Sequence, residues 1–276
     1  MQYKTLIVDG PYLAHRSYSS PYRLTTGDLD ATMIHGFIRT LNAKRKEFNP
    51  NKIIVAWESH GTPSWRRELV STYKPGKQLN KQFISSQEDL KILLHLLNVS
   101  QYYSPTNEAD DVIARLILDE QTEFPVLIYT PDKDIMQTIG DSVHTYNGKQ
   151  IFKSEDVKKK FGVWPEDIPK FLAIVGDDAD NIIGVKGIGP KKAAKYIYEE
   201  DKKDCSLRKY KEQIKLNEKL TKLNYGCELK KLEIKTEHTI ESLLNKYKLK
   251  SIQAKIEEYK KIGQKREPKL KGDWIW

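Results

Sequence analysis

The sequence predicts an α/β fold, with a central, mostly parallel sheet flanked by helices and a helical second domain. Apolar runs of strand type occur at 5–8, 53–57 and 126–130. Amphipathic stretches separate them, and this β-α-β order implies parallel strands joined by right-handed crossovers. The later part of the chain is helical in pattern, rich in lysine and interrupted by glycines. We therefore place the α/β domain in residues 1–160 and the helical domain in residues 161–276.

Length and composition fit such a fold. The chain has 276 residues, of which 38% are hydrophobic, enough for a sizeable core. No apolar stretch reaches the eighteen or so residues that a membrane span needs, and the first strand begins close to Met1, so we expect an untargeted, cytoplasmic protein. Cys205 and Cys227 have no spaced His or Cys partners, which argues against a zinc site.

Helices and a basic segment connect the predicted strands. Residues 30–48 and 86–97 have helical periodicity. Between them, at about 61–85, lies a basic arch or loop in which Tyr73-Lys74-Pro75-Gly76 breaks any helix. Its aromatic residues either stack on unpaired bases or pack in a core, and the sequence leaves both open. The basic and aromatic residues are Trp65, Arg66, Arg67, Tyr73, Lys74, Lys77, Lys81 and Phe83. Among them, the expected DNA contacts are Arg66, Arg67, Tyr73, Lys77 and Lys81.

Carboxylates stand where the predicted strands end, at Asp9, Glu58 and Asp132. The carboxyl ends of parallel strands meet at one edge of a sheet, where ligands bind in open α/β folds. Two carboxylates about 4 Å apart repel by roughly 4 kcal/mol at an effective dielectric near 20, so only cations or protons can hold a cluster together. Oxygen ligands without His or Cys select hard ions, here Mg²⁺ or Mn²⁺. The nine candidate ligands are Asp9, Glu58, Glu108, Asp110, Asp111, Asp132, Asp134, Asp177 and Asp180.

Two of these acidic groups also have a structural explanation. Residues 105–107 are a helix start signal, and acids in a first turn complement the helix dipole by about 0.3–1 kcal/mol each. This would account for the acidic run 108–111 on its own. Asp132-Lys133-Asp134 would serve equally well as a solvated turn. Neither explanation accounts for an acidic helix start that faces three acidic strand ends.

A glycine-rich hairpin lies between two predicted helices, 165–175 and 190–199, within the segment 165–200. The sequence Gly184-Val-Lys-Gly-Ile-Gly-Pro-Lys-Lys-Ala193 has the helix-hairpin-helix pattern. Its glycines permit tight turns and close backbone approach, and amides at the next helix start face a phosphate. A purely structural turn is the alternative, but the lysines favour a phosphate site. The DNA-binding candidates here are Lys186, Gly187, Gly189, Lys191 and Lys192.

Charge separates the two parts of the chain. Residues 1–200 hold 26 basic and 26 acidic residues, whereas residues 201–276 hold 21 and 12, so the net charge of +9 lies in the tail. With the nine candidate ligands set aside, residues 1–200 also carry +9. A basic exterior around an acidic centre suits a polyanion that lies over a metal site. The tail has apolar residues at helical spacing, and we expect a helical layer that completes the second domain.

These motifs together resemble the 5′ nuclease, or flap endonuclease, family, which includes phage and bacterial 5′-3′ exonucleases and the N-terminal domain of bacterial DNA polymerase I. The resemblance runs from Leu6 to about Lys195 in the family's order. Its most specific block is Gly-Asp-x-x-Asp-Asn at 176–181, running into the hairpin. The resemblance implies a PIN-like 5′ nuclease core and a helix-three-turn-helix in the second domain.

The family resemblance also implies roles for individual residues. Lys74 resembles the arch lysine that reaches the scissile phosphate, and Arg16 resembles a basic residue that faces it from the first helix. The hairpin of the family binds K⁺ through backbone carbonyls, here those of Val185 and Ile188. The first ion is implied at Asp9, Glu108, Asp110, Asp111 and Asp132, and the second at Asp134, Asp177 and Asp180.

Glu58 departs from the family pattern, which usually has Asp after this strand. The extra methylene would displace the carboxylate by about 1.5 Å, tolerable for a ligand that acts through water. The metal affinity would then differ from that of the family.

The function expected from these observations is two-metal hydrolysis of DNA phosphodiesters by a flap endonuclease and 5′-3′ exonuclease, in removal of replication primers and flaps. The expected partners are DNA with 5′ flaps, nicks or ends, with RNA–DNA primers and replication proteins as further candidates. We expect a monomer in a bacterial cell or a phage-infected host, with no membrane association. The alternatives are a small ribonuclease, which would not need the hairpin, and a catalytically silent, structure-specific DNA-binding protein with Glu58 as a degraded ligand.

Overall fold

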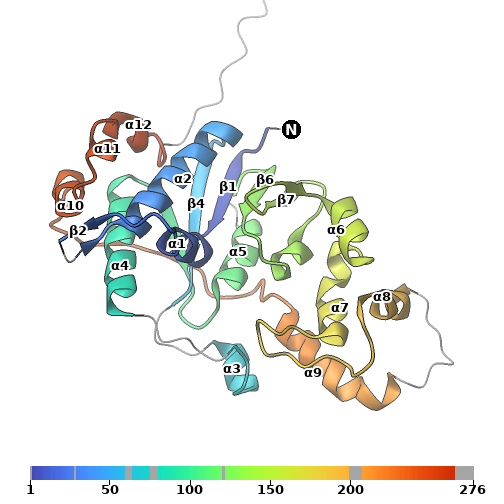
Figure 1. The fold of residues 1–276 in the computed structure, drawn as a ribbon. Helices are drawn as coiled ribbons and strands as arrows, with labels where there is room; N and C mark the ends of the chain where they lie inside the picture. Colours follow the sequence, from blue (N-terminus) through green and yellow to red (C-terminus); the bar gives the residue numbers. More distant parts are fainter. Residues whose placement is uncertain are drawn as a thin grey trace, which may run out of the picture.

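A seven-stranded sheet forms the centre of the chain in a computed structural model (Figure 1). The structure describes residues 2–27, 29–59, 64–74, 80–119, 122–198 and 207–264. The strand order is β8-β7-β6-β1-β4-β5-β9, with five parallel central strands and one antiparallel strand at each edge. The strands are Thr5–Asp9 (β1), Lys52–Trp57 (β4), Ser100–Tyr103 (β5), Val126–Tyr129 (β6), Val143–Tyr146 (β7), Ile151–Phe152 (β8) and Lys230–Lys231 (β9).

Helices cover both faces of this sheet, and the alternation of side chains along β1 shows how. Leu6 and Val8 point to one face, where they pack with three helices in the larger core. Ile7 points to the other face and packs against a single helix in a second core. The helices are Gly10–Tyr18 (α1), Thr32–Phe48 (α2) and Lys81–Leu96 (α4) on the first face, and Ala109–Ile117 (α5) on the second. The predicted mostly parallel α/β core is confirmed.

The first domain also contains a short antiparallel strand pair and, in the basic segment, a short helix. Thr25–Thr26 (β2) and Leu29–Asp30 (β3) form a small antiparallel pair between α1 and α2. Trp65–Leu69 (α3) is a short helix within the expected arch. The helix predicted at 86–97 begins earlier, because Asn80 caps α4 by accepting a hydrogen bond from the backbone amide of Phe83. Lys77 lies outside the described residues, and so do parts of the segment that would form a closed arch.

The second domain is helical and has its own hydrophobic core, which includes Phe171, Leu172 and Ala193. The helix expected at 165–175 is divided, since a 3₁₀ turn precedes the α-helix. Its elements are Pro165–Asp167 (η2), Ile168–Val175 (α7), Pro190–Tyr198 (α8), Arg208–Tyr210 (η3) and Lys211–Thr221 (α9). Two elements of the first domain, Asp134–Thr138 (η1) and Ser154–Phe161 (α6), also pack against this core. The sequence prediction of a helical second domain is confirmed.

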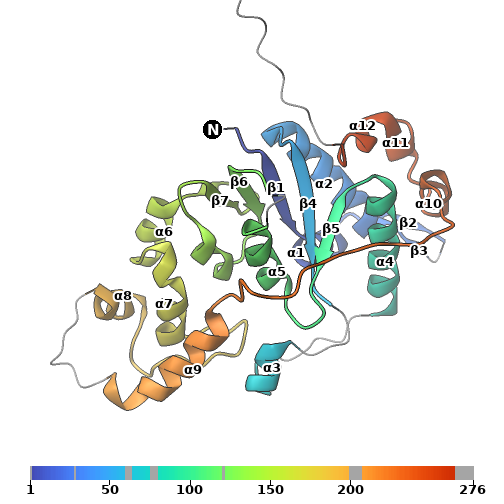
Figure 2. The same cartoon turned by 180° about the vertical axis from the view of Figure 1, so that it is seen from behind.

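The tail returns to the first domain, contrary to our expectation that it completes the second. After α9 the chain runs along the sheet edge as β9 (Figure 2), and three short helices then pack beside α2 and α4. Leu243, Leu244 and Ile252 join the core of the first domain. The hydroxyl of Tyr247 and the ammonium of Lys246 donate to the buried Oδ2 of Asp89 in α4, at 2.5 and 2.6 Å. The tail helices are Ile240–Lys246 (α10), Lys250–Gln253 (α11) and Ile256–Lys260 (α12).

No helix in the described part of the chain is both long and apolar enough to cross a membrane. Cys227 is a buried thiol outside any disulfide, and Cys205 lies outside the described residues.

Candidate metal centre and its family

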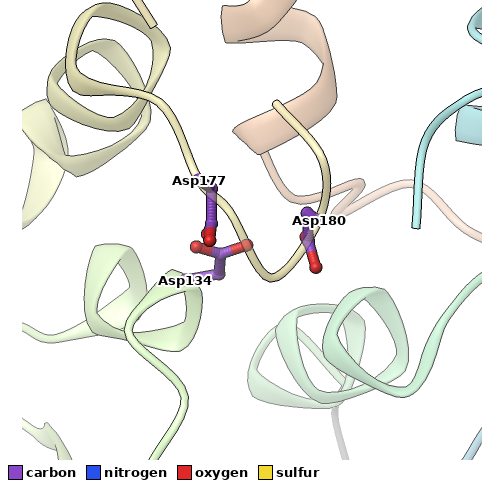
Figure 3. A group of neighbouring side chains, drawn as sticks. All are labelled: Asp134, Asp177 and Asp180. Atoms are coloured by element: carbon purple, nitrogen blue, oxygen red, sulfur yellow. The ribbon is translucent and has the colours of Figure 1, made fainter. Parts of the chain in front are cut away.

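Three carboxylates from two parts of the chain meet at the carboxyl edge of the sheet. Asp134, Asp177 and Asp180 each present an oxygen within 4.8 Å of the others, and all three residues are buried. Figure 3 shows the carboxylate of Asp134 directed towards that of Asp177, with Asp180 on the same loop. Asp134 opens η1 after β6, whereas the other two flank the turn that follows α7. The chain therefore gathers these charges from two domains.

Backbone hydrogen bonds fix the loop that carries two of these acids. The amide of Asp177 donates to the carbonyl of Ile182 at 2.8 Å, and the reverse bond has the same length. The side chain of Asn181, at φ +57°, donates to the carbonyl of Thr72, and the amide of Lys74 donates to that of Asp180. The loop is thus joined to the end of the basic segment.

Asp9 is held by the strand end itself. The hydroxyl of Thr130 donates to Asp9 Oδ2 at 2.8 Å, and the amide of Tyr12 donates to Oδ1 at 2.9 Å. Burial raises the pKa of Asp9 to about 6, and the charges of Asp132 and Glu58 add to the increase, although these two hydrogen bonds oppose it. Thr130 is a positioning residue that the sequence analysis missed, although its place two residues before Asp132 offered a signal.

The remaining acids of the edge repel one another. Burial, and next the charge of Asp132, raises the pKa of Asp110 well above its ordinary value. Burial likewise raises the pKa of Asp134, with further contributions from Asp132, Asp180 and Asp177. A cluster with several raised pKa values is one that a bound cation would stabilise.

Lys74 meets this cluster from the basic segment. Its ammonium lies 2.9 Å from Glu108 Oε2 and 3.8 Å from Asp180 Oδ1. Burial alone would raise the pKa of Glu108, but the charges of Lys74 and Arg66 outweigh it and lower that pKa. The side chain of Lys74 remains 45% exposed, so its ammonium is at the border between the acidic centre and solvent.

Asp111 forms an ion pair with Arg66, which also contacts Glu108 at 3.6 Å. Its carboxylate is fully buried and accepts two hydrogen bonds from Arg66, at 2.7 and 2.8 Å, and one from the amide of Asn224. The indole nitrogen of Trp65 also contacts it, at 3.3 Å. Both oxygens of Asp111 therefore already have hydrogen-bond donors. We assign Asp111 a structural role as the partner of Arg66.

Arg66 and Tyr73 are interior residues and not the DNA contacts that we expected. Arg66 is 2% exposed and also donates to the carbonyls of Leu220 and Lys222. Tyr73 is 3% exposed, and its hydroxyl donates to Asp180 Oδ2 at 2.9 Å. Phe83 is buried as well and stacks with His15 at 4.4 Å between ring centroids. Of the two interpretations of the aromatic residues, core packing holds for Tyr73 and Phe83.

The other basic candidates lie at the surface. Arg16 is exposed on α1, and its guanidinium donates to the hydroxyl of Tyr129 at the end of β6. Arg67 is half-buried on α3, and Lys81 is exposed in the first turn of α4. Arg16 is thus placed beside the strand end that precedes Thr130 and Asp132.

The hairpin exposes its glycines and lysines. Gly187 has φ +81°, in the left-handed region, and a Cβ added there or at Gly189 would meet nothing in the described structure. Lys186, Lys191 and Lys192 are exposed around these glycines. By contrast, a Cβ at Gly184 would lie 2.1 Å from the carbonyl of Val175, so this glycine is required for packing.

The carbonyls expected to bind K⁺ lie beneath this exposed turn. The amide of Val185 donates to the carbonyl of Ile174, and that of Ile188 donates to the carbonyl of Val185. Val185 itself is buried.

The sequence and the fold both match known proteins. Residues 4–162 match the family "5′-3′ exonuclease, N-terminal resolvase-like domain", and residues 163–255 match "5′-3′ exonuclease, C-terminal SAM fold". The 5′-3′ exonuclease of Aquifex aeolicus (strain VF5) is 33% identical over 243 residues, which cover 80% of this chain and 82% of that protein. Thermostable DNA polymerase I of Thermus thermophilus is 34% identical over 200 residues, 71% of this chain but only 24% of the polymerase. The chain therefore corresponds to about a quarter of that larger relative.

Solved structures share the fold. The complex of bacteriophage T5 flap endonuclease with DNA and metal ions has a TM-score of 0.64 at 19% identity, and the match covers 94% of this chain and 96% of that one. T5 5′-exonuclease with bound zinc also has a TM-score of 0.64, at 21% identity, over 80% of this chain and 90% of that one. Because the family motifs cover both domains and the relatives are exonucleases, this chain belongs to the 5′-3′ exonuclease family.

Proposed function

We propose that this chain is a structure-specific 5′ nuclease, a flap endonuclease and 5′-3′ exonuclease, that hydrolyses DNA phosphodiesters with two divalent ions. The observation that carries the proposal is the meeting of Asp134, Asp177 and Asp180 within 4.8 Å at the sheet edge. Asp9 and Asp110, both with raised pKa values, lie in the same electrostatic cluster. Membership of the exonuclease family supports the same reaction.

The residues present fit hard divalent ions. The Oδ1 atom of Asp134 is buried and has no hydrogen-bond partner among the described residues, as expected of an oxygen that serves as a metal ligand. The donors are all carboxylate oxygens, which favours Mg²⁺, with Mn²⁺ as a substitute. We assign the second ion to Asp134, Asp177 and Asp180. We assign the first ion to Asp9, Glu58, Glu108, Asp110 and Asp132.

Such ions, when bound, supply an activated water and stabilise charge on the phosphate. The protein's own residues prepare the site for this chemistry. Thr130 and the amide of Tyr12 fix the orientation of the Asp9 carboxylate. The ammonium of Lys74 and the guanidinium of Arg16 are placed to offset negative charge on the phosphoryl oxygens. Cleavage would leave a 5′ phosphate on the product.

The exposed hairpin would hold the duplex part of the substrate. Its open glycines allow a phosphate close to the backbone, and Lys186, Lys191 and Lys192 add charge without reading sequence. We propose a K⁺ ion bound by the carbonyls of Val185 and Ile188 as part of this grip. The T5 relative has been solved with both DNA and metal ions, which supports DNA as the substrate.

We propose a role in primer and flap removal during replication, which the similarity to part of DNA polymerase I supports. We propose DNA with 5′ flaps, nicks or ends as substrates, with RNA–DNA primers and replication proteins as further candidates. We also propose that the chain acts as a monomer.

A labelled 5′-flap duplex tests the proposed activity. We expect cleavage near the junction in Mg²⁺ or Mn²⁺, none with a chelator, and at least a hundredfold slower cleavage in Asp177→Asn, because the second ion is lost. The exposed Asp178→Asn variant is the matched control and should cut at the wild-type rate. Binding of the flap without cleavage in either metal would overturn the proposal and identify a silent DNA-binding protein.

A further inference from the structure

Lys133 makes an ion pair inside the cluster assigned to the second ion. Its ammonium lies 2.9 Å from Oδ1 of Asp177, and the side chain of Asp177 is only 4% exposed. The same oxygen accepts a hydrogen bond from the amide of Ala179 at 3.0 Å. Lys133 stands between Asp132 and Asp134 in sequence, so one turn supplies two acids and a cation that contacts a third acid from the other domain.

The position of Lys133 conflicts with that of a divalent ion. A cation bound by Asp134, Asp177 and Asp180 would use the carboxylate oxygen that the ammonium already contacts, and the two positive charges would repel at short range. The side chain of Lys133 is 37% exposed, so its flexible stem can move the ammonium into solvent. Binding of the ion therefore includes the cost of breaking this ion pair.

We propose that Lys133 is a positioning residue that holds Asp177 in the absence of the second ion and lowers the affinity of that site for a divalent ion. This inference rests on the proposed function. It has a consequence for the order of binding. A DNA phosphate attracts both the ammonium and the ion, so the second ion binds more tightly once substrate is present.

A solvated turn lysine would not behave in this way. Such a residue has no fixed partner, and its removal would change metal binding only through its long-range charge. The ion pair with a buried carboxylate predicts a larger and local effect. The exposed Lys170 on α7 offers a comparison, since no ion pair among the described residues joins it to the three carboxylates.

Calorimetric titration with Mn²⁺ in the absence of DNA tests the proposal on the full chain. We expect the second ion to bind about tenfold more tightly to Lys133→Met than to the wild type, a difference that corresponds to the removal of one competing ion pair. Lys170→Met, which removes the same formal charge, should change this affinity less than twofold. Equal affinities in Lys133→Met and the wild type, or equal changes in both variants, would overturn the proposal.

Two further measurements separate this inference from the proposed function. Addition of a 5′-phosphorylated product duplex should tighten Mn²⁺ binding by a larger factor in the wild type than in Lys133→Met; equal factors would count against the role of Lys133. Lys133→Gln is the second variant should Lys133→Met not fold. Asp177→Asn should abolish binding of the second ion, and unchanged binding there would refute the metal site itself.

Discussion

Arg66 and Asp111 form a buried, bidentate ion pair between α3 and α5, with nitrogen–oxygen distances of 2.7 and 2.8 Å. The pair joins the basic segment to the helix that carries the acidic run. It also connects both to the C-terminal end of α9, because Arg66 donates to the carbonyls of Leu220 and Lys222. The residues thus fix the start of the basic segment relative to the sheet edge.

Loss of one partner of this pair should destabilise the protein. In Asp111→Asn the buried guanidinium of Arg66 keeps its charge but loses its nearest counter-ion, with only Glu108 left at 3.6 Å, and we expect a decrease of about 3 kcal/mol in the free energy of unfolding. Urea denaturation measures this change. Calorimetry on the folded variant should show both Mn²⁺ ions still binding, whereas loss of an ion without loss of stability would restore Asp111 to the metal site.

Lys74→Ala should slow the chemical step. A preorganised cation beside the scissile phosphate is worth about 10²–10³ in rate, so single-turnover cleavage should fall by that factor while the Kd for the flap changes far less. Lys81→Ala, at the exposed start of α4, should weaken binding and leave the rate of the bound complex unchanged. A wild-type single-turnover rate in Lys74→Ala would disprove the catalytic assignment.

The hairpin lysines should control the salt dependence of DNA binding. Removal of one phosphate-binding lysine reduces the slope of log K against log salt by about 0.9, so Lys191→Ala/Lys192→Ala should flatten it by about 2. Fluorescence anisotropy on a duplex between 50 and 200 mM salt, in Ca²⁺ to prevent cleavage, measures the slope. An unchanged slope would remove these two residues from the interface.

The stability of the metal-free protein should fall as the pH rises. Burial raises the pKa of Asp9 from 3.8 to about 6, so the native state binds this proton more tightly than the unfolded chain does. That stabilisation is complete below about pH 4 and is lost as the pH rises through 6, a change of about 3 kcal/mol.

On the proposed assignment of Asp9 to the first ion, Mg²⁺ would replace the proton that Asp9 releases, and scanning calorimetry can measure the compensation. Added Mg²⁺ should therefore raise Tm more at pH 7.5 than at pH 5. Asp9→Asn should reduce this pH dependence, since the variant has no proton to release at this position. A Mg²⁺-induced rise in Tm that is the same at both pH values would contradict the prediction.

Removal of the Tyr247 hydroxyl should loosen the tail. Asp89 is a buried carboxylate that accepts from Tyr247 and Lys246, and loss of one hydrogen bond to such a charge costs about 1 to 3 kcal/mol. Urea unfolding of Tyr247→Phe should show this decrease. Tyr22→Phe removes a hydroxyl from a residue that is 85% exposed, and should change stability by less than about 0.5 kcal/mol. Equal stability in both variants would argue against this role of Tyr247.

A simple geometric rule allowed the sequence to place acids at one edge of the sheet. Parallel strands end at the same edge, so acids after β1 and β6 must approach one another wherever the helices lie. The same rule could not predict that Asp110 and Asp111 have different surroundings. Successive residues of a helix point about 100° apart, and only the position of Arg66, from a different element, shows which of the two acids forms a buried ion pair.

Helical spacing likewise could not show where the tail packs. Leu243, Leu244 and Ile252 identify an apolar face, but any complementary surface would satisfy it. The surface on α2 and α4 is selected by partners such as Asp89, which lies far away in the sequence and carries no pattern of its own. Lys133 is a similar case, because its partner Asp177 comes from the other domain.

Because the chain returns to the first domain after α9, the helical second domain is an insertion within the first. Its polypeptide leaves the sheet after β8 and rejoins it at β9, so both of its ends are anchored in the same sheet. A single cut would leave the α/β part without the segment that covers α2 and α4, so the two parts are not separable by truncation. If a bound duplex displaced the hairpin, it would pull on both ends of the helical domain, at β8 and at β9. The displacement would also reach the cluster of acids directly, through the loop that carries Asp177 and Asp180.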